Sequence, residues 1–145
     1  MKPSIFLADD DEDDCVLFQD AMNEVAGDYE LVIAYDGQEL LETLETRVPP
    51  IPRVIFIDLN MPRKDGMECL QEIRRMEKLK DIPVVILSTS SQPNSIERAY
   101  ALGASHYVTK PGTYAMLKKT IELVLAIDWS NTQPISFDRF FISIS

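Results

Sequence analysis

Five short apolar segments recur along the chain, and each is followed by an amphipathic segment. The apolar segments are rich in β-branched and aromatic residues, which is typical of strands buried on both faces of a parallel sheet. They cover residues 4–8, 31–34, 54–57, 83–87 and 106–109. The amphipathic segments carry apolar side chains at helical spacing within residues 12–27, 38–45, 66–76, 96–103 and 113–127. This alternation predicts an α/β fold with a doubly wound, five-stranded parallel sheet in the flavodoxin-like order 2-1-3-4-5.

Polar residues follow four of the predicted strands. Asp9 and Asp10 follow the first strand, Asp58 the third, Ser88 the fourth and Lys110 the fifth. Because these four strands are neighbours in the predicted order, their carboxyl ends meet at one edge of the sheet. Three carboxylates in one crevice repel one another, which favours either raised pKa values or a bound hard cation. Mg²⁺ fits best, because it binds through one or two carboxylates, a carbonyl oxygen and water.

A lysine and a hydroxyl beside such a metal suit a phosphoryl group. Lys110 would neutralise charge on the phosphoryl oxygens, and Ser88 would donate a hydrogen bond. Asp58 is then interpreted as a nucleophile that accepts phosphate and becomes an acyl phosphate. No glycine-rich phosphate-binding loop follows any predicted strand, so a nucleotide is not the expected ligand.

Over residues 3–127 the sequence resembles the receiver domain of bacterial two-component response regulators, of the chemotaxis type. The resemblance rests on an acidic pair after the first strand, an acceptor motif after the third, a hydroxyl residue after the fourth, and a lysine-proline pair after the fifth. In this chain these are Asp9-Asp10, Asp58 with Asn60, Met61-Pro62 and Asp65-Gly66, then Ser88, Gly103-Ala104, and Lys110-Pro111 preceded by Tyr107.

The resemblance implies a phosphoacceptor and a metal site. Asp58 would be the phosphoacceptor, and Mg²⁺ would be held by the side chains of Asp10 and Asp58. The backbone carbonyl of Asn60 and, through water, Asp9 would complete the protein ligands. Lys110 would pair with the phosphoryl group.

The resemblance also implies a switch and a cis proline. Ser88 and Tyr107 would report phosphorylation to the last helices. The family often has threonine at the position of Ser88, and serine keeps the hydroxyl. The bond between Lys110 and Pro111 would be cis, although bonds before proline are otherwise mostly trans.

The implied function is a stand-alone response regulator that signals by protein–protein contact. Its phosphoryl donor would be a sensor histidine kinase or a phosphotransfer protein, and its downstream partner is a further protein of unknown identity. Rather than being an enzyme, it would catalyse only its own phosphorylation and dephosphorylation. Two alternatives stay open: a degenerate receiver that acts as a phosphorylation-independent interaction module, and an Asp-nucleophile phosphohydrolase of the haloacid dehalogenase type. The second normally needs another Asp where this chain has Asn60.

Composition limits the other possibilities. The 145 residues, 46% of them hydrophobic, predict one receiver domain over residues 1–127 and a tail over residues 128–145, with no separate effector domain. A net charge of -10 disfavours direct binding to nucleic acid. No apolar run approaches the roughly 20 residues that span a bilayer, so a cytoplasmic protein without membrane contact is expected. Cys15 and Cys69 have no metal-binding spacing and are expected to be reduced and buried.

Some of these residues also have a simpler interpretation. Residues 11–14 alone are typical of a solvated cluster of acidic side chains. Tyr107 could pack in the sheet with its hydroxyl in solvent. His106, the only histidine, is expected to be exposed and to have no catalytic role.

The tail is too apolar for a solvated peptide. Its apolar residues are Trp129, Ile135, Phe137, Phe140, Phe141, Ile142 and Ile144, and the alternation at its end is typical of an edge strand. Three outcomes are open: docking on its own domain, pairing with another subunit or partner, and disorder. A homodimer through the last helices or the tail is one form of the second.

Overall fold

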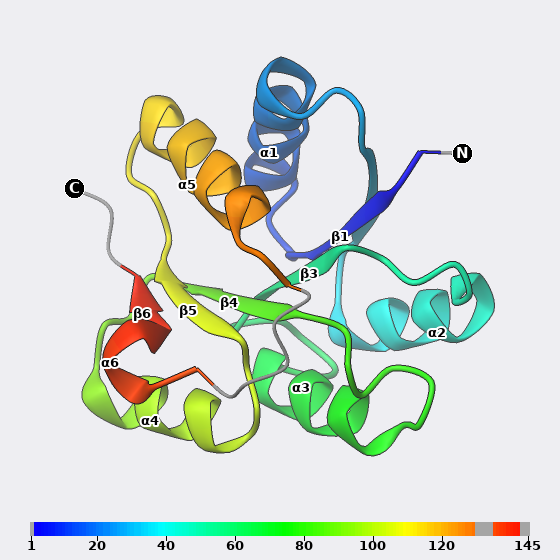
Figure 1. Ribbon diagram of the computed structural model, residues 1–145, viewed down its shortest axis with the longest axis vertical. Coiled ribbons are helices and arrows are strands. Elements are labelled where there is room, and N and C mark those ends of the chain that lie inside the picture. Colours follow the sequence, from blue (N-terminus) through cyan, green and yellow to red (C-terminus); the bar gives the residue numbers. More distant parts are fainter. Residues whose placement is uncertain (1, 130–134, 143–145) are drawn as a thin grey trace.

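Six parallel strands form the centre of the protein. The computed structural model describes residues 2–129 and 135–142. In space the strands follow the order β2-β1-β3-β4-β5-β6, and all neighbouring pairs are parallel (Figure 1). Their bounds are β1 (Ser4–Ala8), β2 (Glu30–Ala34), β3 (Val54–Asp58), β4 (Val84–Ser88), β5 (His106–Thr109) and β6 (Phe141–Ile142).

Helices cover both faces of this sheet. On one face lie α1 (Glu12–Val25) and α5 (Tyr114–Ala126), and on the other α2 (Gly37–Arg47), α3 (Gly66–Arg75) and α4 (Pro93–Ala101) (Figure 1). Each face has its own core: Phe18, Phe56 and Ile121 belong to the first, and Leu40 and Leu70 to the second. All residues of β3 and β4 are buried, as expected for strands covered on both sides.

The helix that follows the acceptor strand is anchored by its first residues. Asp65 caps α3 in a reciprocal capping box with Glu68. Gly66 comes next, and a Cβ atom there would lie 2.7 Å from the backbone carbonyl oxygen of Asp58. Only a glycine lets the start of α3 lie this close to the end of β3, so this contact sets the position of Asp58.

The predicted strand order and the alternation with helices are confirmed. Element ends differ from the sequence prediction by at most three residues, as is usual for helix ends. For example, α2 begins at Gly37 because Asp36 accepts a hydrogen bond from the backbone N–H of Glu39 and caps the helix one residue earlier than expected.

The described part of the tail docks on its own domain. A single turn, α6 (Phe137–Phe140), leads into β6, which pairs with β5 through the Tyr107–Phe141 and Val108–Ile142 registers. Phe140 is fully buried and Tyr100 donates a hydrogen bond to the carbonyl of Ile135 (2.7 Å). The sheet therefore has one strand more than predicted. The predicted edge-strand alternation extends to Ile144, which lies outside the described residues.

The expected exposure of His106 is wrong. The imidazole is 7% exposed, because Phe140 and Trp129 cover the strand edge on which it lies. Its Nδ1 atom is 3.2 Å from the carbonyl oxygen of Phe140, so Nδ1 carries the proton and donates. Burial lowers the pKa of His106 below its usual value, against the opposing effect of the backbone hydrogen bonds.

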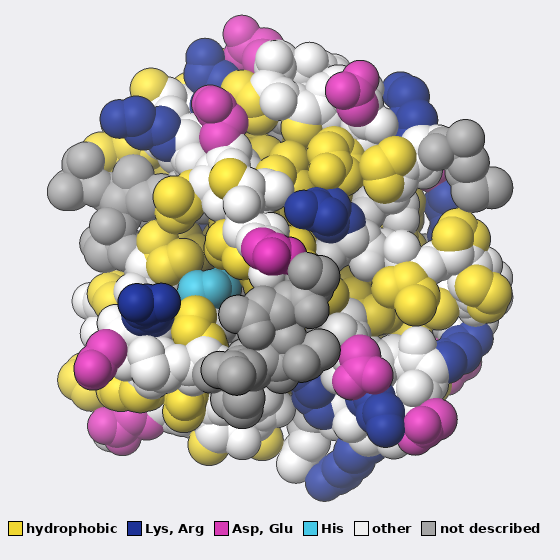
Figure 2. Space-filling view, viewed as in Figure 1, with side chains coloured by type: hydrophobic (Ala, Val, Ile, Leu, Met, Phe, Trp, Pro, Cys, Tyr) yellow, Lys and Arg dark blue, Asp and Glu magenta, His cyan; other side chains and the backbone are white. Residues whose placement is uncertain are grey.

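The cysteines behave as predicted: Cys15 and Cys69 are free and buried. Burial raises the pKa of each thiol to about 12, which keeps both thiols protonated. No helix in the described part of the chain is long and apolar enough to cross a membrane. Figure 2 shows acidic and basic side chains scattered around one face, with hydrophobic side chains between them.

Candidate functional site

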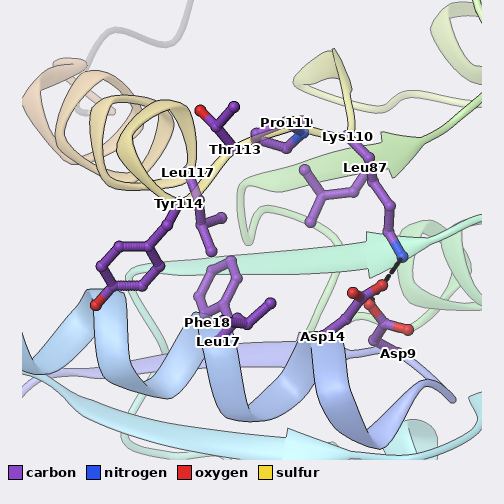
Figure 3. Close-up of a pocket in the computed structure, with 11 residues that line it drawn as sticks. Asp9, Asp14, Leu17, Phe18, Leu87, Lys110, Pro111, Thr113, Tyr114 and Leu117 are labelled. Carbon is purple, nitrogen blue, oxygen red and sulfur yellow. Dashed lines mark hydrogen bonds and ion pairs between the residues drawn. The ribbon is translucent and has the colours of Figure 1, made fainter.

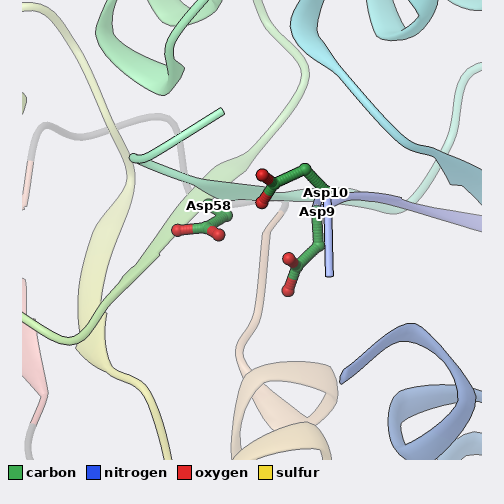
Figure 4. Close-up of side chains that lie close together, drawn as sticks. All are labelled: Asp9, Asp10 and Asp58. Carbon is green, nitrogen blue, oxygen red and sulfur yellow. The ribbon is translucent and has the colours of Figure 1, made fainter. Parts of the chain in front are cut away.

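The predicted acidic residues meet at the carboxyl edge of the sheet. Asp9 follows β1, Asp10 is the next residue, and Asp58 ends β3 (Figure 4). Each offers one carboxylate oxygen, and these oxygens all lie within 4.8 Å of one another. Asp9 and Asp58 are 2% and 6% exposed, whereas Asp10 is exposed. Two buried carboxylates and one accessible carboxylate form a pocket able to bind a divalent metal.

Lys110 joins this cluster from the end of β5. Its Nζ atom lies 3.0 Å from Asp9 Oδ2 and 3.3 Å from Asp58 Oδ2. Burial alone would lower the pKa of Lys110, but the hydrogen bonds with Asp14 and Asp9 and the charge of Asp58 raise it overall. The ammonium form is therefore present at neutral pH and compensates part of the negative charge.

Asp58 is held at both carboxylate oxygens. The backbone N–H of Asn60 donates to Oδ1 (3.2 Å), and Lys110 pairs with Oδ2. Burial raises the pKa of Asp58 to about 6, while Lys110 opposes and Asp9 reinforces this rise. A divalent cation in the pocket would favour the ionised carboxylate, which is the nucleophilic form.

Asp14 is a site residue that the sequence analysis missed. The local pattern of residues 11–14 predicts a solvated acidic cluster, but the Oδ2 atom of Asp14 lies 2.9 Å from Nζ of Lys110 (Figure 3). The signal available in the sequence is the position of Asp14 in the first turn of α1, four residues after Asp10 and therefore near the end of β1. Asp11 behaves as expected of an exposed residue and caps α1.

Ser88 and Tyr107 lie on strands β4 and β5 and both contact the loop that follows β4. Ser88 ends β4 fully buried, and its hydroxyl oxygen accepts a hydrogen bond from the backbone N–H of Ser90 (3.0 Å). Tyr107 is also fully buried, and its hydroxyl donates to the carbonyl of Ser90 (2.8 Å). The alternative of a tyrosine hydroxyl in solvent does not hold, because the backbone carbonyl of Ser90 accepts its hydrogen bond. Both side chains therefore act on the same loop, directly after β4.

The expected cis bond before Pro111 is wrong for this structure. The cis bonds within the described residues are Val48–Pro49 and Pro49–Pro50, so the Lys110–Pro111 bond is trans. A trans bond is the intrinsic preference before proline. In this conformation Lys110 contacts Asp9, Asp14 and Asp58.

A small cavity adjoins the cluster between α1 and α5. It has a volume of about 220 Å³, its apolar wall includes Phe18, Leu87 and Leu117, and Asp14 and Lys110 lie at one end (Figure 3). The charged cluster is thus bordered on one side by an apolar surface, which excludes water from part of the ion pairs.

The protein has a flavodoxin-like α/β fold, with a doubly wound parallel sheet. An acidic pocket and a lysine at the carboxyl edge of this sheet form a site suited to a divalent metal. Comparison with known proteins makes this class specific. Residues 5–122 match the response regulator receiver domain, and the chain belongs to that family. Receiver domains interact with histidine kinases and are not classical enzymes.

Several relatives are similar over most of their length. Response regulator Rcp1 of a Synechocystis species is 36% identical over 122 residues, which is 81% of this chain and 83% of the relative. The crystal structure of a phosphorylated cyanobacterial phytochrome response regulator, RcpA, is 34% identical with a TM-score of 0.80, covering 92% of this chain and 97% of that one. A manganese-bound structure of Rcp1 is 31% identical with a TM-score of 0.76, and the match covers 92% of this chain and 99% of that one.

Proposed function

We propose that this protein is a response regulator whose Asp58 accepts a phosphoryl group in a Mg²⁺-dependent reaction. The donor is a phosphohistidine on a sensor histidine kinase or a phosphotransfer protein, and the output is contact with a further protein. The observation that carries the proposal is the meeting of three carboxylates within 4.8 Å, with the Lys110 ammonium 3.3 Å from Asp58. The similar proteins RcpA and Rcp1 were crystallised phosphorylated and with Mn²⁺, respectively.

The transfer is a substitution at phosphorus. An oxygen of the ionised Asp58 carboxylate forms a bond to phosphorus while the bond from phosphorus to the donor's imidazole nitrogen breaks, and the electron pair of that bond stays on the imidazole. The Asn60 N–H keeps the carboxylate oriented, and Lys110 compensates charge on the phosphoryl oxygens.

The acidic pocket fits a Mg²⁺ ion by its chemistry. The side chains of Asp9, Asp10 and Asp58 supply hard oxygen donors, and the backbone carbonyl of Asn60, two residues after Asp58, would add another. When bound, the ion would neutralise negative charge between the carboxylates and the incoming phosphoryl group. Asp10 is the only exposed one of the three carboxylates, and it reaches the pocket without an ion pair to Lys110.

Ser88 and Tyr107 are proposed as the switch. Both contact Ser90, so a change in the hydrogen bonding of the Ser88 hydroxyl moves the same loop that receives the Tyr107 hydroxyl. Phosphorylation would thereby be read out on α4, which follows this loop, and on β5, which carries Tyr107.

Intact-mass spectrometry after incubation with acetyl phosphate tests the proposal. Wild type should gain one phosphoryl group in Mg²⁺ and none in EDTA, and Asp58→Asn should gain none. Asp28→Asn, which changes an exposed aspartate away from the site, is the matched control and should be labelled like wild type. If labelling by acetyl phosphate and by a panel of histidine kinases fails in wild type, the chain is a phosphorylation-independent interaction module instead. Turnover of external phosphoesters would support the phosphohydrolase alternative.

A further inference from the structure

We infer that Asp14 is a positioning residue that holds Lys110 before phosphorylation and gives it up to the phosphoryl group. The inference rests on the proposed function and concerns a residue outside the predicted metal pocket. The Asp14 carboxylate is the nearest to the Lys110 ammonium, at 2.9 Å, although Asp14 is not one of the three clustered metal-type carboxylates.

The Lys110 ammonium has no spare donor. An ammonium group carries three N–H donors, and here they face Asp9, Asp14 and Asp58 at 3.0, 2.9 and 3.3 Å. A phosphoryl group on Asp58 brings several further acceptor oxygens to the same place. The donor that faces Asp58 can turn to these oxygens, because phosphorylation removes the negative charge of that carboxylate. A second donor of Lys110 reaches the phosphoryl oxygens only if its contact with Asp9 or Asp14 is released.

Exposure decides which contact is released. The Asp9 side chain is 3% exposed, so losing Lys110 would leave a buried carboxylate without its partner, which is costly. The Asp14 side chain is 42% exposed, so its carboxylate can return to water at little cost. Asp14 is therefore the partner that exchanges.

The position of Asp14 suits a contact that forms and breaks. Its backbone is fixed, because its N–H donates to the Asp11 cap in the first turn of α1. Its side chain reaches over the end of the apolar cavity to Lys110 (Figure 3). A fixed backbone with a half-exposed side chain restores the same ion pair each time the phosphoryl group leaves.

Removing the Asp14 carboxylate should make phosphorylation easier. Without it Lys110 has one donor free in advance, and one negative charge fewer repels the phosphoryl group. For a partly exposed ion pair we expect about a threefold to fivefold effect. Asp14→Asn should be labelled faster by acetyl phosphate and should bind beryllium fluoride, a phosphoryl mimic, more tightly by a similar factor. Asp14→Glu keeps the carboxylate and should behave like wild type.

Asp13→Asn is the matched control, because Asp13 lies in the same turn, is exposed and has the same charge, but has no ion pair with Lys110. The decisive measurement compares the labelling rate and the beryllium fluoride affinity of Asp14→Asn and Asp13→Asn, once with Lys110 present and once with Lys110→Met. With Lys110 present, Asp14→Asn should exceed Asp13→Asn in labelling rate and in affinity for beryllium fluoride by the stated factor. With Lys110→Met, the two variants should no longer differ in either quantity.

Each result separates this inference from the proposed function. If wild type is labelled and the two Asn variants behave alike, Asp14 contributes only its charge and the inference is overturned. The same holds if the difference persists without Lys110. If wild type is not labelled by any donor and does not bind beryllium fluoride, both the proposed function and this inference fall.

Discussion

The Nδ1 atom of His106 lies 3.2 Å from the carbonyl oxygen of Phe140 and joins strand β5 to the C-terminal segment. The neutral imidazole can donate one hydrogen bond here, and burial disfavours its charged form, so the pKa of His106 is lowered in the folded protein. Docking of the segment is therefore linked to the protonation of a single side chain.

This linkage predicts a pH-dependent stability with a defined sign. Above the unfolded pKa of about 6.5, His106 is neutral in both states and its contribution is complete. As the pH falls below about 6.5 the unfolded state binds a proton that the folded state does not, so stability is lost until the lower folded pKa is passed. Urea unfolding between about pH 8 and pH 5 should show this loss. His106→Asn, which cannot titrate, should lose less stability over this range, and equal losses in both proteins would contradict the linkage.

Phe140 should contribute most of the packing of the C-terminal segment. It is fully buried and its ring lies 5.0 Å from that of Tyr100 and 6.4 Å from that of Tyr107. Phe140→Ala should cost about 3 kcal/mol or release the segment, since a buried phenylalanine is lost. Phe137, at 45% exposure, is the control and should cost under about 1.5 kcal/mol. Chemical unfolding gives the cost, and the fluorescence of Trp129, the only tryptophan, reports release because its ring lies 5.9 Å from that of His106.

The close approach at Gly66 predicts a linked loss of stability and function. A Cβ atom 2.7 Å from the Asp58 carbonyl oxygen must push the start of α3 and the end of β3 apart. Gly66→Ala should cost about 1–3 kcal/mol and, by displacing Asp58, slow labelling by about tenfold or more. Gly112→Ala is the control, because apart from its chain neighbours no described residue lies within 4 Å of its Cβ position, although it is near Lys110 in the chain. Labelling of Gly66→Ala at the wild-type rate would show that the contact does not position Asp58.

Divalent metal should stabilise the protein through its acidic pocket. A ligand that binds only the folded state adds about 1.4 kcal/mol for each tenfold excess over its dissociation constant. Mg²⁺ should therefore raise the midpoint of unfolding of wild type, and EDTA should reverse the shift. Asp10→Asn removes an exposed member of the pocket without disturbing Lys110, so it should be more stable than wild type in EDTA and gain less from Mg²⁺. An equal gain in Asp10→Asn would exclude Asp10 as a ligand.

The carboxyl edge of the sheet was predictable because it depends on strand order alone. Once β1, β3, β4 and β5 are recognised as neighbours, Asp9, Asp58 and Lys110 must converge whatever the side-chain details. Asp14 was not predictable in the same way, because its contact depends on the angle of α1 over the sheet and on the rotamer of Lys110.

The environment of His106 was hidden for a different reason. Its burial is created by Phe140, 34 residues later, after a stretch whose alternation was compatible with docking, with pairing to a partner or with disorder. Local pattern indicated that the tail was apolar, but its docking place depends on the free edge of β5 and on the rings of Tyr100 and Tyr107. Such long-range packing has no periodic signature in the sequence.

Tyr107 should carry the response from the site to the C-terminal segment. Its hydroxyl donates to the Ser90 carbonyl, two residues after Ser88, and its ring lies 5.9 Å from that of Phe141 in β6. A phosphoryl group that recruits the Ser88 hydroxyl would disturb the Ser90 loop and, through Tyr107, the packing of Phe141. Beryllium fluoride with Mg²⁺ should therefore change amide hydrogen exchange both in the loop after β4 and in residues 137–142.

Tyr107→Phe tests whether the Tyr107 hydroxyl couples the loop after β4 to residues 137–142. It removes only the hydroxyl, at a cost of about 1 kcal/mol, and keeps the ring against Phe141. The exchange change after β4 should remain in this variant, whereas the change in residues 137–142 should shrink. Tyr100→Phe is the matched control, because its hydroxyl bonds to Ile135 and does not contact the Ser90 loop. Tyr100→Phe should weaken docking of the C-terminal segment with and without beryllium fluoride, but the change in amide exchange of residues 137–142 should remain. If this change is lost equally in Tyr107→Phe and Tyr100→Phe, general packing and not the Tyr107 hydroxyl carries the signal.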